Sequence, residues 1–118
     1  MQSELTLPKF LTREPRLLQG LCCGIEKESL RVSPEGQLSS RPHPTALGSA
    51  LTHPNITTDF SEAQLELITR VHADPDDAIG ELTDVHRYVY QNLQDELLWA
   101  GSMPCILGDD ADIPVGRY

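Results

Sequence analysis

The sequence predicts an α+β fold in which helices cover one face of a sheet. Residues 24–32 and 56–70 have the side-chain alternation of β-strands, and residues 74–97 carry an apolar stripe at helical spacing. Nine prolines divide the 118 residues into short elements. A chain of this length is expected to form one domain and to bury about two-thirds of the surface that its unfolded form exposes.

The first third of the chain is expected to contain a helix, a strand and a turn. Residues 9–22 suit a short helix interrupted near Pro15, and residues 24–32 follow as a strand. Residues 33–36, Ser-Pro-Glu-Gly, have proline at the second turn position and glycine at the last. Residues 37–40 are then expected to return as a short antiparallel strand, which makes a hairpin.

The middle of the chain is expected to supply two more strands. Prolines within residues 41–44 exclude a regular element there, and residues 45–51 suit one or two helical turns. Residues 56–60 and 63–70 read as a strand pair or as one bent strand. In the second of these, apolar residues alternate with Glu66, so Glu66 is expected on the face away from the helices.

The clearest helix follows these strands. Asp74 is a suitable N-cap and Pro75 suits the first helical position. Apolar residues then recur at three- and four-residue steps at Ile79, Leu82, Val85, Val89, Leu93 and Leu97. The helix is expected to end near residues 99–101, and an extended segment at 102–107 and an acidic loop at 108–112 follow it.

Composition argues against two classes of partner. Eighteen acidic and nine basic residues give a net charge of -9, which repels nucleic acid and anionic membrane surfaces. No apolar run has the length of a membrane span. The sequence therefore predicts neither a nucleic-acid partner nor a membrane partner.

Cysteine usage and the first residues indicate a cytoplasmic location. Residues 1–10 have no basic and apolar leader pattern, and an odd number of cysteines forms no disulfide framework. Cys22 and Cys23 are expected to be buried, inert thiols. The four histidines match no zinc-ligand spacing.

Two acidic clusters are the candidate functional feature. Glu26 and Glu28 stand two residues apart on one predicted strand and therefore share a face. Asp59 and Glu66 belong to the second predicted strand segment. Carboxylates gathered in this way become favourable when a hard divalent cation lies between them, because oxygen ligands with full negative charge are those that Mg²⁺ selects.

Spacing alone also allows a solvated polar face. In that interpretation Lys27 and Arg31 balance the charge of the glutamates locally, and such faces are more common than metal sites. No glycine-rich phosphate-binding loop occurs in the sequence. A nucleotide would therefore have to bind through metal ions.

Four linked motifs carry a family resemblance. Residues 24–32 (GIEKESLRV), 43–53 (HPTALGSALTH), 56–66 (ITTDFSEAQLE) and 102–104 (SMP) closely resemble the N-terminal region of proteobacterial glutamate–cysteine ligases. The match runs from about Leu17 to the end of the chain, in the same order and at the same intervals. The resemblance implies a curved antiparallel sheet, part of a glutamine-synthetase-like catalytic fold, with the active site on its concave face.

The resemblance also implies a reaction and a set of site residues. ATP would activate the side-chain carboxylate of L-glutamate, and L-cysteine would attack it to give γ-glutamylcysteine, the first step of glutathione synthesis. Mg²⁺, or Mn²⁺, would bind at the family positions occupied by Glu26, Glu28, Asp59 and Glu66. Phe60 falls where the family lines the pocket for cysteine.

The chain departs from the family in length. Residues 1–118 are expected to form a single partial domain, the N-terminal segment of a longer catalytic domain, and to be inactive until the remainder of the ligase completes the site. Two alternatives stay open. One is a non-catalytic remnant or metal-binding module that folds alone, and the other is a ligase of the same superfamily that uses a different amine.

Overall fold

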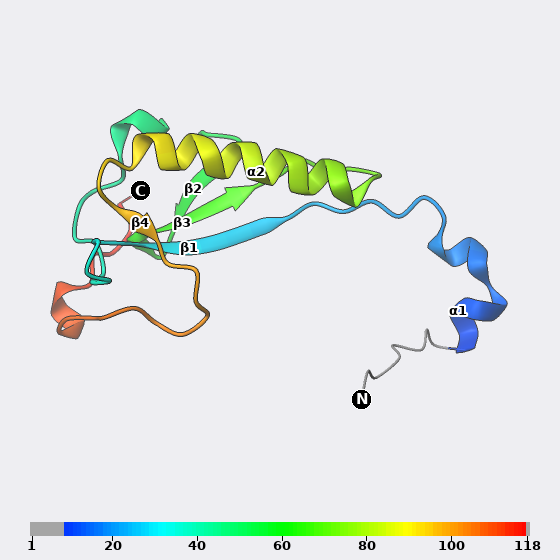
Figure 1. Ribbon diagram of the computed structural model, residues 1–118, viewed down its shortest axis with the longest axis horizontal. Helices are drawn as coiled ribbons and strands as arrows, with labels where there is room; N and C mark the ends of the chain where they lie inside the picture. The colour runs from blue at the N-terminus through cyan, green and yellow to red at the C-terminus, as the bar shows by residue number, and fades with distance from the viewer. Residues whose placement is uncertain (1–8, 118) are drawn as a thin grey trace.

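A four-stranded antiparallel sheet covered on one face by a long helix forms the centre of the molecule (Figure 1). The computed structural model describes residues 9–117. The strand order is β2-β3-β1-β4. The strands are β1 (Glu26–Val32), β2 (Ile56–Asp59), β3 (Ser61–Ile68) and β4 (Leu97–Leu98), and the helices are α1 (Lys9–Arg13) and α2 (Pro75–Asn92). Three short 3₁₀ turns lie at Pro15–Leu18, Thr45–Leu47 and Asp110–Asp112. The predicted α+β class is confirmed.

Helix α2 begins as predicted. The carboxylate of Asp74 accepts a hydrogen bond from the backbone N–H of Asp76 (2.9 Å), and Pro75 occupies the first turn. The apolar stripe differs from the prediction in its first turn. Ile79, which was expected to be buried, is 54% exposed, and the neighbouring Ala78 is buried instead. No helix within residues 9–117 is long and apolar enough to cross a bilayer.

The core lies between α2 and the sheet. Apolar residues of β3 face the helix, and Glu66 on the same strand faces away from it, as the alternation predicts. The residues of the core cluster come from both layers and are Leu47, Ile56, Leu65, Leu67, Val89, Leu93 and Leu98. The turn at residues 33–36 forms with Gly36 at a positive φ of 83°, but residues 37–40 return through isolated bridges and not as a strand.

The N-terminal arm stands away from the sheet. Helix α1 and the 3₁₀ turn at Pro15–Leu18 project beyond one end of α2 and β1 in Figure 1, so the predicted interruption at Pro15 is confirmed. The expected burial of both vicinal thiols is wrong: Cys22 is exposed and Cys23 is only partly buried. These residues lie in the connection between arm and sheet, outside the core between β3 and α2. Cys105 is the buried cysteine.

A buried arginine sets where α2 ends. The side chain of Arg31 has no exposed surface, and its Nη1 donates to Oε2 of Glu96 at 2.6 Å. Its Nη2 donates to three backbone carbonyls, those of Arg41, Pro42 and Glu62. One side chain therefore connects β1, the proline-rich loop, β3 and the segment after α2.

The helix ends at Asn92 and not near residues 99–101, which corrects the sequence-based prediction. Gln94 turns the chain with a φ of 60°, and Glu96 reaches Arg31. Leu97 and Leu98 then pair with β1 as strand β4, so Leu97 leaves the predicted stripe and is 45% exposed. The buried ion pair and the added strand outweigh two further helical turns.

Glu81 joins α2 to the opposite end of the sheet. Its carboxylate accepts hydrogen bonds from Nε2 of His72 (2.6 Å) and from the backbone N–H and Nε of Arg70 (both 3.0 Å). The hydrogen bond from His72 and those from Arg70 lower the pKa of Glu81 to about 2. The segment after β3 is therefore held against the helix.

A substitution that removes the buried guanidinium of Arg31 tests whether this side chain holds β1, the proline-rich loop and the segment after α2 together. Arg31→Met is expected to lower the free energy of unfolding by about 3–5 kcal/mol, because Glu96 is left buried and unpaired. The double variant Arg31→Met/Glu96→Leu is expected to lose less. Arg41→Met, which breaks the exposed pair with Asp95, is the control and should change little. Urea denaturation measures all three, and equal losses in the two single variants would contradict the assignment.

Candidate functional site

The sheet face opposite α2 brings the predicted carboxylates together. Glu28 on β1 lies directly opposite Glu66 on β3, and Thr57 on β2 flanks Glu66 on its other side. Directly opposed residues of an antiparallel pair have Cβ atoms about 4.5–5.5 Å apart. Glu28 and Glu66 therefore form a like-charged cross-strand pair, which is unfavourable by itself.

Glu26 and Asp59 complete the cluster from either side. Glu26 lies on the same face of β1 as Glu28 and pairs with Ile68, and Asp59 ends β2 where the register with β3 shifts. Burial, followed by the charges of Glu26, Glu28 and Asp59, raises the pKa of Glu66. All four predicted residues thus contribute to one negative potential centred on Glu66.

No basic side chain of residues 9–117 forms an ion pair with this cluster. The proposed balance by Lys27 and Arg31 is wrong, because odd-numbered residues of β1 face α2 and Arg31 is buried against Glu96. The recorded partner of Glu28 is neutral: Nε2 of Gln64 donates to its Oε2 at 3.0 Å. The negative charge of this face is therefore not compensated within the described residues.

The chemistry of this donor set fits a hard divalent cation, although its geometry is open. Carboxylates from three strands lie on one face, and burial together with their mutual repulsion raises the pKa of Glu66. Within residues 9–117, however, no three histidine, cysteine or acidic side chains are arranged to hold a metal ion. The face supplies ligands of the right kind, and the coordination shell has to be closed by other groups.

Phe60 occupies a strained corner at the edge of this face. It lies between β2 and β3 with a φ of 50°, which is unusual for a bulky side chain, and its ring is 79% exposed. Its carbonyl accepts a hydrogen bond from the backbone N–H of Gly116 (2.7 Å), and the hydroxyl of Ser61 donates to the carbonyl of Pro114 (2.7 Å). The corner presents an aromatic ring to solvent beside Asp59.

A pocket that sequence reasoning missed adjoins the cluster on its other side. It encloses about 360 Å³ between β1 and residues 99–104, and Glu28 and Gln64 line it. Alternation correctly places Gln64 on the face of Glu66, but a lone glutamine carries no functional signal in the sequence. The motif at residues 102–104 was the available sign that this loop matters.

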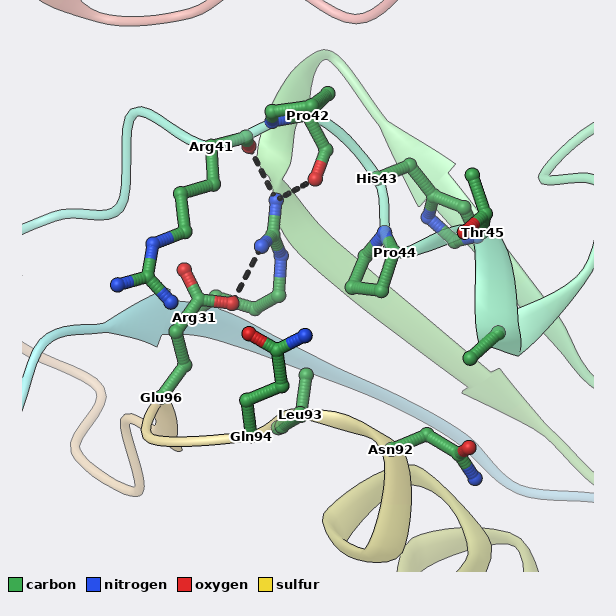
Figure 2. Close-up of a pocket in the computed structure, with 11 residues that line it drawn as sticks. Arg31, Arg41, Pro42, His43, Pro44, Thr45, Asn92, Leu93, Gln94 and Glu96 are labelled. Atoms are coloured by element: carbon green, nitrogen blue, oxygen red, sulfur yellow. Dashed lines mark hydrogen bonds and ion pairs between the residues drawn. The ribbon is translucent and has the colours of Figure 1, made fainter.

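A second pocket lies beside the C-terminal end of α2, away from the carboxylates (Figure 2). It encloses about 290 Å³, and Arg31, His43, Gln94 and Glu96 are among the residues that line it. Burial, and next the charge of Arg31, lowers the pKa of His43, so its ring is neutral at pH 7. The dashed contacts in Figure 2 belong to the buried arginine, which gives this region a structural role.

Comparison with known proteins connects this face to one family. The family model described as glutamate-cysteine ligase matches residues 9–118. A glutamate–cysteine ligase of Alcanivorax borkumensis is 55% identical over 101 residues, which are 86% of this chain and 19% of that protein. The chain thus spans about a fifth of the length of this curated relative.

Two solved structures share the fold. The glutamate–cysteine ligase of Francisella tularensis, solved in complex with AMP, has a TM-score of 0.75 at 45% identity over 78% of this chain and 18% of that one. A bifunctional glutathione synthetase from Pasteurella multocida has a TM-score of 0.83 at 35% identity over 92% of this chain and 16% of that one. The sheet and helix described above are therefore a recurrent part of much longer proteins.

The raised pKa of Glu66 leads to a stability test. When the pKa of Glu66 is higher in the folded state than in the unfolded state, ionisation of Glu66 lowers the free energy of unfolding as the pH rises from the unfolded pKa through the folded pKa. Glu66→Gln is therefore expected to stabilise the chain at pH 7, and its advantage over the native chain should shrink as the pH falls towards 4.5 and be lost below 4.5. Chemical denaturation at several pH values measures the difference. Glu35→Gln, in the exposed turn, is the control, and an equal gain there would count against the cluster.

Proposed function

The chain belongs to the glutamate–cysteine ligase family, and we propose that it forms one wall of the metal and ATP site of a larger ligase. In this proposal the complete enzyme joins the side-chain carboxylate of L-glutamate to the amino group of L-cysteine at the expense of ATP. The product is γ-glutamylcysteine. The wall is the sheet face opposite α2.

The observation that supports this most is the uncompensated charge around Glu66. Burial and the charges of Glu26, Glu28 and Asp59 raise its pKa, and within residues 9–117 no basic side chain forms an ion pair with the cluster. A protein gains no stability from such a cluster, so a role in binding is the simplest reason for it. Mg²⁺, or Mn²⁺, is the group that these four carboxylates would hold. Once bound, it would neutralise charge on the phosphoryl oxygens of ATP.

Each residue has a distinct place in the proposed site. Glu66 lies at the centre of the cluster, with Glu28 opposite it and Asp59 at the outer strand. Gln64 holds one oxygen of Glu28, which leaves the other oxygen to meet a ligand. Phe60 extends an exposed ring beyond Asp59, where it would contact the amino-acid substrate. The AMP complex of the Francisella relative supports a nucleotide as the other ligand.

Activity of the separate and complete proteins tests the proposal. The 118-residue chain alone is expected to form no γ-glutamylcysteine from ATP, glutamate and cysteine, because it supplies only one side of the site. A complete ligase carrying this segment is expected to form it, and Glu28→Gln should lower kcat/KM by at least about 100-fold. Glu35→Gln is the matched control and should retain activity.

The opposite results have clear meanings. Turnover by the 118-residue chain alone would contradict the half-site interpretation. Tight Mg²⁺ or Mn²⁺ binding by that chain in calorimetry, combined with no turnover by the complete protein, would favour a metal-binding module instead. An open half-site is expected to bind either ion only weakly.

Phe60 allows stability and function to be separated. Phe60→Asn places a residue that tolerates positive φ at the strained corner, and it removes an exposed ring. The variant chain is expected to gain about 1 kcal/mol of unfolding free energy. In a complete ligase it is expected to raise KM for cysteine and to leave KM for ATP unchanged. Phe60→Tyr is the conservative control, and an equal rise in both KM values would contradict the assignment.

A further inference from the structure

Strand β1 has one open edge over most of its length. Its other edge pairs with β3 from Glu26 to Leu30, whereas β4 covers the open edge only at Arg31 and Val32. In Figure 1, β4 and the segment that follows it lie near one end of β1, and the opposite end continues into the N-terminal arm. Within residues 9–117, no strand therefore lies beside the outer edge of residues 26–29.

The backbone groups on this open edge belong to Glu26 and Glu28. The backbone N–H of Trp99 donates to the carbonyl of Leu30 (2.8 Å), so Leu30 directs its N–H and C=O towards β4. The direction of these groups alternates along a strand, so Glu28 and Glu26 direct theirs to the same edge. An uncovered strand edge is a template for pairing with another extended segment.

A groove lies beside this edge, between β1 and α2. It encloses about 360 Å³ and is lined by Lys27, Ile79, Leu82, Thr83, His86 and Arg87. Ile79, which helical spacing places in the core, presents its exposed side chain here. An apolar wall next to an open strand edge suits a segment that both extends the sheet and packs against the helix.

Lys27 gives the groove a positive charge without an acidic partner. Its side chain lies on the α2 face of β1, and its Nζ donates to the hydroxyl of Ser29. None of the ion pairs formed within residues 9–117 includes Lys27. Burial, and next the charge of Lys27, lowers the pKa of His86. In a chain with 18 acidic and nine basic residues, this arrangement favours an acidic group as the missing neighbour.

We infer that an extended segment from the rest of the ligase pairs with the open edge of β1 and packs into this groove. The inference rests on the proposed function in one respect, that this chain is part of a longer ligase. The matched residues are 19% of the Alcanivorax relative, so a complete ligase has ample chain to supply the segment. Side chains of the segment that point towards α2 enter the groove, where an acidic one meets Lys27 and an apolar one covers Ile79.

Thiol labelling of a complete ligase that contains these 118 residues tests whether the groove is covered. Ile79→Cys is expected to react with a maleimide at least about tenfold more slowly than Asp77→Cys, although both positions are exposed in the described structure. Asp77 lies on the same helix outside the groove and is the matched control. Mass spectrometry of the labelled peptides separates these sites from the native cysteines. Equal rates at the two positions would overturn the inference.

Substitution of Lys27 tests the expected acidic group. Lys27→Glu is expected to raise the labelling rate of Ile79→Cys at least about fivefold, because two acidic side chains then repel each other in the groove. Lys27→Arg keeps the positive charge, and Arg41→Glu reverses an exposed charge away from the groove; neither should change the rate. An unchanged rate with Lys27→Glu would contradict the charge pairing. The comparison of positions 79 and 77 stands even if Lys27→Glu does not fold.

Hydrogen exchange in the same complete ligase tests the strand pairing itself. The amides of Glu26 and Glu28 are expected to exchange as slowly as those of Lys27 and Ser29, which are directed towards β3. Fast exchange at the two glutamates would overturn the pairing.

The mass of the ligase in solution identifies the occupant of the groove. Protection of position 79 that is lost when a dimer dissociates on dilution would assign the groove to a second copy and overturn the inference. Protection in a monomeric ligase supports it. If that monomer makes no γ-glutamylcysteine, the proposed function fails while this inference stands.

Discussion

The rest of the structure depends on the buried ion pair between Arg31 and Glu96. A guanidinium with no exposed surface requires a partner, because an unpaired buried charge costs several kcal/mol. The partner comes from 65 residues away in the chain, and three carbonyls from other segments complete the arginine's hydrogen bonds. Satisfying this one side chain stops α2, brings β4 onto the sheet and orders the proline-rich loop.

Side-chain alternation gives the sheet two faces with different roles. The face towards α2 holds the apolar core and the paired charges, so it contributes stability. The opposite face holds Glu26, Glu28, Asp59 and Glu66; burial and then the repulsion of the other three raise the pKa of Glu66, which reduces stability. Unfavourable groups supported by a well-packed layer are typical of binding sites.

Local interactions explain which elements could be predicted. The N-cap at Asp74, the turn ending at Gly36 and the alternation along β3 each depend on residues a few positions apart, and all three are present. The end of α2 and the exposure of Cys22 were predicted wrongly. Helical spacing continues through Leu97, so the early end of the helix follows only from Gln94, Glu96 and the distant Arg31.

The sequence by itself determined the chemistry of the candidate face: four carboxylates, their positions on strands and their family motifs can all be read from side-chain order. Tertiary structure alone decided that Glu28 lies opposite Glu66, that Gln64 binds Glu28, and that residues 99–104 form a pocket beside them. The physical reason is the distance along the chain over which each interaction acts. Side-chain period and capping act within one strand or helical turn, whereas cross-strand register and the burial of Arg31 are decided by contacts between distant segments.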